Sequence, residues 1–120
     1  MFLEYVLKQI EADDPEGCLR ILISDSVAER RLRSEFDQIL YPGEASCLAL
    51  AISRVVTFVT DDLAARRLAE ERGVSLSGTL GVLIALVRDK AFSLKDANAM
   101  LAEMIQRHYR APVDHLDEFI

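Results

Sequence analysis

The sequence predicts an α/β domain built around a small parallel sheet. A β-branched run at residues 55–60 and a second short strand candidate at 74–77 alternate with amphipathic helical segments, the order expected of parallel strands joined by helices. The chain has 120 residues, 51% of them hydrophobic, so it is long enough and apolar enough to bury one core. No repeat, linker or low-complexity tract divides it, and we expect a single domain over residues 1–120.

The first part of the chain is expected to be mainly helical. Apolar residues recur at helical spacing from Phe2 to Ile10, and an acidic turn ending at Gly17 should stop this helix. The sequence Tyr41-Pro42-Gly43 should break a later helix. The predicted elements are a helix over residues 2–10, a strand over 19–24, a helix over 28–40 and a very apolar helix over 44–54.

The run VVTFVT at residues 55–60 is the best strand candidate, and its composition indicates burial on both faces, as in a central parallel strand. The next helix has an acidic start and an Arg72-Gly73 finish, as capping and dipole preferences favour. In the helix predicted over residues 79–90, Gly81 indicates that another part of the chain packs closely. The remaining predicted elements are helices over residues 62–72, 79–90 and 94–108, a strand over 74–77, and an end segment over 112–120 that packs or frays.

The net charge of −6 is concentrated at the two ends of the chain. Residues 1–18 carry −4 and the last eight residues carry −3, which leaves +1 on residues 19–112. An acidic total of this kind does not exclude an anionic substrate.

Composition also points to a cytoplasmic protein. The longest apolar runs are far below the roughly 20 residues of a membrane span, and the chain opens on Met-Phe-Leu-Glu without a basic leader. Cys18 and Cys47 have neither disulfide nor metal-ligand spacing, so we expect reduced thiols.

Three acids fall where a parallel sheet binds its ligands. Asp61 and Asp62 follow the carboxyl end of the strand over 55–60, and Glu44 opens the helix that runs back antiparallel to it. Clustered carboxylates repel one another unless a hard cation neutralises them, and oxygen ligands favour Mg²⁺ or Mn²⁺. All three acids also lie at helix starts, where the helix dipole favours them, so spacing alone leaves both interpretations open.

Basic residues and a glycine-rich turn follow these acids. Arg66 and Arg67 could steer phosphates, or could pair with Glu70 and Glu71 at helical spacing. The turn around Thr79 follows a strand and opens a helix, and it could bind a phosphate or fix helix packing. No dinucleotide or P-loop fingerprint occurs.

Three motifs carry a resemblance to a known family. They are PGEA followed by LALA from Pro42, VVTFVTDDLAARRLAEERGV from Val55, and SGTLGVLIALVRDK from Ser77. Together they resemble the PIN-like family, and most closely the branch in which a helix opens with GEA, a strand ends in DD and a later helix begins with GTLG. The likeness covers about residues 19–119.

The resemblance implies a three-layer α/β/α nuclease domain that depends on Mg²⁺ or Mn²⁺. Such domains often act on RNA as the VapC-type toxin of a toxin–antitoxin pair and are commonly homodimers. Carried over by position, Glu44 and Asp62 would be catalytic metal ligands, with Asp61 as a catalytic neighbour in the acidic cluster. Arg66, Arg67 and Thr79 remain candidate ligands for phosphate or RNA.

One part of the family pattern is missing. PIN domains begin with a buried strand that ends in an essential aspartate and is followed by a helix, and this chain opens on a later part of that pattern. We therefore expect an N-terminally truncated domain with weak or absent nuclease activity and an exposed sheet edge covered by dimerisation, by exchanged elements or by its own first segment. The alternative function is a non-catalytic module that self-associates or binds an antitoxin-like partner.

Overall fold

The computed structural model describes residues 12, 14, 16–17, 20, 22–23 and 25–120. The helix expected over residues 2–10 and the thiol of Cys18 lie outside the described residues. Of the strand expected over 19–24, the structure describes Arg20, Leu22 and Ile23, and none of these three residues lies in a strand. For these three residues the strand prediction was wrong.

The described chain is a mixed helix and strand structure, as predicted. Its helices are α2 (Val27–Phe36), α3 (Pro42–Arg54), α4 (Leu63–Glu71), α5 (Thr79–Arg88) and α6 (Leu94–Gln106), and a 3₁₀ turn η1 (Asp117–Phe119) follows. The strands are β1 (Phe58–Val59), between α3 and α4, and β2 (Leu76–Ser77), between α4 and α5. This order confirms the α/β fold class. None of the described helices is both long and apolar enough to cross a bilayer.

The two strands pair in parallel, with Phe58 opposite Leu76 and Val59 opposite Ser77. The Phe58 amide donates to the Ser75 carbonyl at 2.8 Å, which extends the pairing at one end. Both strands are much shorter than the runs at 55–60 and 74–77 from which they were predicted. Helix α4 forms the crossover between them, as parallel strands require.

Burial of β1 on both faces, expected from composition, was wrong. Phe58 is buried, but Val59 is 53% exposed and Val56 is 48% exposed. Among the described residues β1 pairs with β2 and with no second strand. A β-branched composition favours extended structure, but it does not indicate whether other elements cover one or both faces of the strand.

The break predicted at residues 41–43 lies slightly earlier in the structure. Helix α2 ends at Phe36, and Pro42 already occupies the first turn of α3, where a proline loses no helical hydrogen bond. Helix α3 ends at Arg54, and its C-cap residue Val55 has a left-handed φ of 54°. That conformation is unusual for a β-branched residue.

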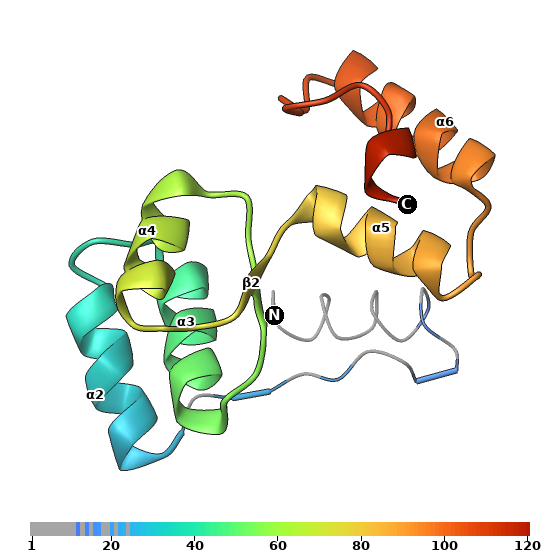
Figure 1. Ribbon diagram of the computed structural model, residues 1–120. Helices are drawn as coiled ribbons and strands as arrows, with labels where there is room; N and C mark the ends of the chain where they lie inside the picture. Colours follow the sequence, from blue (N-terminus) through green and yellow to red (C-terminus); the bar gives the residue numbers. More distant parts are fainter. Residues whose placement is uncertain (1–11, 13, 15, 18–19, 21, 24) are drawn as a thin grey trace.

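Two hydrophobic cores divide the described chain. The first lies among α2, α3, α4 and the strands, and its fully buried members include Phe36 and Leu48. The second lies between α5, α6 and the chain end, where Leu83, Leu101 and Leu116 are buried. The predicted packing of the end segment is confirmed by Leu116. The cores occupy separate lobes joined through β2 and α5 (Figure 1), and the Cα radius of gyration is 16.2 Å, against about 14 Å for a compact chain of this length.

An ion pair fixes the start of α2 against the end of α3. Ser26 and Glu29 form a capping box at the start of α2, and Arg54 Nε donates to Glu29 Oε2 at 2.9 Å. Glu29 is 2% exposed. The hydrogen bond from Arg54 is the main reason why the pKa of Glu29 is lowered from 4.5 to about 2.

We predict that Glu29→Gln lowers the melting temperature at pH 7 and that the difference from the native chain disappears in acid. The native carboxylate contributes stability above its unfolded pKa of 4.5, and this contribution is lost as the pH falls toward about 2. Thermal unfolding followed by circular dichroism between neutral and acidic pH measures it. Glu35→Gln is the matched control, since Glu35 is on the same helix in an exposed ion pair with Arg72. Equal losses in both variants at every pH would contradict the prediction.

Candidate functional site

Two of the predicted acids meet where α3 begins and α4 begins. Glu44 lies in the first turn of α3, and Asp62 is the N-cap residue of α4. Burial raises the pKa of Glu44, and the negative charge of Asp62 raises it further. Glu44 and Asp62 are therefore neighbours across 18 positions of sequence.

The Glu44 carboxyl group is incompletely satisfied. Its Oε2 atom is fully buried and has no hydrogen-bond partner among the described residues. A hydrogen bond with Thr60, which sequence reasoning missed, partly opposes the rise in the pKa of Glu44. A buried polar atom without a partner is costly and is uncommon unless it serves a purpose.

Asp62 is held rigidly in place. Its Oδ2 accepts from the Ala65 amide at 2.9 Å, and its own amide donates to Thr60 Oγ1 at 3.1 Å. The helix-dipole interpretation of this acid is thus correct, and the same carboxylate also faces Glu44. The capping role is therefore observed for Asp62, and the metal-ligand role stays a prediction.

Asp61 is engaged elsewhere. Its Oδ1 accepts from the Thr79 amide at 3.0 Å, and its Oδ2 accepts from the Thr79 hydroxyl. Gly78, the N-cap residue of α5, has no side chain to serve this purpose. Asp61 therefore caps α5 from a different element, and the Thr79 groups that could have bound phosphate are bonded to it.

Arg66 and Arg67 also differ, since one is bonded within the fold and the other is exposed. Arg66 Nη1 donates to the Thr60 carbonyl at 2.8 Å and to the Ser77 carbonyl at 3.2 Å, so it ties together the ends of both strands. These two carbonyl groups account for the position of Arg66 without a phosphate and without an ion pair to Glu70. Arg67 is exposed, and the described residues offer it no ion pair.

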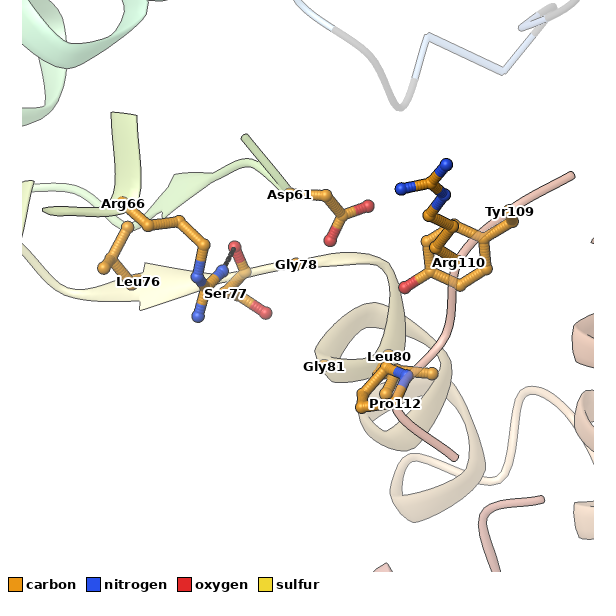
Figure 2. Close-up of a pocket in the computed structure, with 10 residues that line it drawn as sticks. All are labelled: Asp61, Arg66, Leu76, Ser77, Gly78, Leu80, Gly81, Tyr109, Arg110 and Pro112. Carbon is orange, nitrogen blue, oxygen red and sulfur yellow. Dashed lines mark hydrogen bonds between the residues drawn. The ribbon is translucent and has the colours of Figure 1, made fainter. Parts of the chain in front are cut away.

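A cleft of about 470 Å³ opens beside Asp61. Its floor is the turn from β2 into α5, and its far wall is the segment after α6 (Figure 2). Arg66 lies at one end of the row of lining side chains and Tyr109 with Arg110 at the other, with Asp61 between them. The lining residues are Asp61, Arg66, Leu76, Ser77, Gly78, Leu80, Gly81, Tyr109, Arg110 and Pro112.

The far wall depends on a tight helix end. His108 has a left-handed φ of 77°, and the Tyr109 amide then bonds to the Met104 carbonyl at 3.0 Å. This turn directs Tyr109 back onto the second core. Burial raises the pKa of Tyr109, the charge of Asp61 adds to the rise, and a hydrogen bond with Thr79 opposes it. In the sequence, Tyr109 and Arg110 are an aromatic and a basic residue directly after a predicted helix. This combination is too common to indicate a binding site.

Glu44 and Asp62 fit a divalent cation, although the described residues contain no group of three or more acids, histidines or cysteines arranged around one point. Mg²⁺ is commonly bound by one or two carboxylates together with water and substrate phosphate. Burial and the charge of Glu44 raise the pKa of Cys47, so the nearby thiol stays protonated and oxygen atoms remain the available donors. A cation here would relieve both the unpartnered oxygen and the repulsion between the two carboxylates.

Comparison with protein families gives one match. A family model described as a PIN domain matches residues 8–120, which is most of the chain. Searches of curated proteins and of solved structures give no significant match. The family match confirms the resemblance drawn from the GEA, DD and GTLG motifs, and it does not test individual site residues.

We predict that Glu44→Gln raises the melting temperature at pH 7 in metal-free buffer. The native carboxyl has a raised pKa, so its ionisation costs stability as the pH rises from 4.5 through the folded value. Glutamine does not titrate, and the gain should shrink toward zero near pH 4.5. Calorimetric unfolding with a chelator present measures it, with Glu35→Gln as the control. A lower melting temperature for Glu44→Gln would contradict an unsatisfied carboxylate.

We also predict that Gly78→Ala destabilises the chain by about 1 kcal/mol through loss of the α5 cap. A Cβ atom at Gly78 would lie 2.5 Å from Asp61 Oδ1 and 3.3 Å from the Thr60 carbonyl, so Asp61 must turn away from Thr79. Gly43→Ala is the matched control, because its Cβ would meet nothing within 4 Å.

Denaturant unfolding of Gly78→Ala, Asp61→Ala and the double variant tests this mechanism. Both single variants lose the same cap, so their effects should not add. Additive losses of stability would show that the methyl group introduced by Gly78→Ala acts on something other than Asp61.

Proposed function

We propose that this chain, which belongs to the PIN domain family, is a divalent-metal-dependent nuclease that cleaves RNA at the Glu44–Asp62 pair. The observation that carries the proposal is the buried Oε2 of Glu44, which has no partner among the described residues and lies beside a second carboxylate. A structural acid would be expected to have its oxygen atoms satisfied. A carboxylate whose role is to bind a cation can have an oxygen atom without a protein partner.

The residues of the chain would divide the work as follows. Glu44 and Asp62 would hold Mg²⁺ or Mn²⁺, which when bound can activate water and stabilise the charge that develops on a phosphodiester. The bonds from Ala65 and Thr60 would keep Asp62 in one rotamer, so little reorganisation is needed on binding. Arg67, exposed one turn into α4, would attract the phosphate backbone.

We propose that the nuclease is of the toxin–antitoxin type and that it forms a homodimer or binds an antitoxin-like protein. Large apolar side chains around β1 are exposed and offer a surface for either partner. They are Val55 at 90%, Val56 at 48%, Val59 at 53% and Leu63 at 61%.

The same surface supports the second candidate, a non-catalytic interaction module. The two candidates share the fold and differ at the acid pair. The module needs the exposed valines and has no use for an unpartnered carboxylate. Metal binding by Glu44 and Asp62 therefore separates the two candidates.

We predict Mg²⁺- or Mn²⁺-dependent cleavage of RNA that falls on the order of a hundredfold in Glu44→Gln and in Asp62→Asn. Asparagine caps a helix as well as aspartate, so Asp62→Asn removes charge and keeps α4 intact. Gel analysis of RNA products with and without chelator measures cleavage, and titration calorimetry with Mn²⁺ measures binding. Glu35→Gln should behave as the native chain does.

Two outcomes would overturn the nuclease. Cleavage that persists in chelator would exclude the metal, and cleavage that persists in both variants would exclude these acids. Absence of Mn²⁺ binding by a chain that sediments as a stable dimer would replace the nuclease with the interaction module.

A further inference from the structure

The cleft beside Asp61 has a chemistry that the acid pair does not use. Its walls carry two guanidinium groups, one tyrosine and one carboxylate. Two guanidinium groups outnumber the one carboxylate, which is bonded to Thr79, so the lining is positive on balance. Its floor combines Gly78 and Gly81, which have no side chains, with the apolar side chains of Leu76 and Leu80.

Both arginines retain free donors. Arg66 uses Nη1 on the two strand-end carbonyls, which leaves Nε and Nη2 of the fork available. Arg110 is exposed and has neither a hydrogen bond nor an ion pair with any described residue. An unpaired arginine at the rim of a concave site is suited to a phosphate group.

Tyr109 supplies the apolar surface between them. Its hydroxyl end is bonded to Thr79, and its ring is half-buried in the cleft wall. Because the ring also packs against the second core, it loses little freedom when a flat ligand stacks on it, and every nucleobase has such a face. The charges of Asp61 and Arg66 both act on Tyr109, so the three groups lie around one space.

The cleft adjoins the acid pair. Asp61 lines the cleft and the next residue, Asp62, lies beside Glu44, so the cleft and the acid pair flank the same strand end. A second hollow shares Tyr109 and Arg110 with this cleft, and there Asp114 and Glu118 would repel an anion. The first cleft is thus the side on which a polyanion can continue away from Asp62.

We propose that this cleft binds one nucleotide of a single-stranded RNA next to the bond that is cut, with the base on Tyr109 and its phosphate on Arg110. The proposal rests on the nuclease function above and adds two residues to its substrate site. The Tyr109 ring tolerates any base, so the cleft selects unpaired strands rather than a sequence. Duplex RNA, whose bases are already stacked, cannot use it.

Fluorescence anisotropy of a labelled single-stranded oligoribonucleotide, in chelator to prevent cleavage, tests the cleft. Arg110→Gln should weaken binding and reduce the slope of log affinity against log salt by about 0.7, the value for one phosphate contact on a single strand. Tyr109→Leu should weaken binding roughly tenfold, and Tyr109→Phe should restore it. Arg107→Gln is the matched control, since Arg107 is exposed three residues earlier and pairs with Glu103.

The outcomes separate this inference from the nuclease itself. Binding that depends on Arg110 and Tyr109 in a chain that never cleaves supports the cleft and overturns the nuclease. Cleavage and binding that are unchanged in Arg110→Gln overturn the cleft and leave the nuclease standing. Equal affinity for duplex RNA, with no effect of Tyr109→Leu in a variant that melts as the native chain does, also overturns it.

Discussion

The hydrogen bonds from Thr79 to the Asp61 carboxylate connect the first lobe of the described chain to the helix that begins the second. Asp61 ends the segment that begins with β1, and Thr79 begins the helix that leads into the second core. The N-terminus of a helix needs an acceptor for its free amides, and here the first lobe supplies it. Gly78 leaves room for that bond, since a Cβ there would lie 2.5 Å from Asp61 Oδ1. Arg66 ties the two strand ends beside it, and the cleft opens at the same place.

Two adjacent aspartates serve opposite sides of the strand end. Asp62 has extended backbone angles, φ −68° and ψ 124°, and successive side chains of an extended chain point to opposite sides. Asp61 can therefore cap α5 while Asp62 caps α4 and faces Glu44. A single strand end thus provides a structural anchor and half of an acid pair without competition between them.

The sequence predicted the order of the helices and strands because that information is local. The acidic start of α4, the proline before Glu44 and the β-branched run at residues 55–60 each report on a few neighbouring residues. It also predicted that Glu44 and Asp62 converge, because antiparallel packing of a helix on the strand that follows it leaves little choice. The exposure of Val56 and Val59 was missed because it depends on what covers a strand rather than on the strand. Tyr109 and Arg110 were missed because a left-handed His108 places them, and local composition does not indicate such a turn.

The division into two cores has a consequence for how the molecule responds to a ligand. The cleft lies at the joint, with Asp61 and Arg66 on one lobe and Tyr109 and Arg110 on the other. A ligand that touches both walls adds its binding free energy to the bonds between the lobes, and by mass action it favours the closed arrangement over any opened one. Occupancy and rigidity are then linked, so the second lobe would exchange its amide hydrogens more slowly whenever the joint is filled.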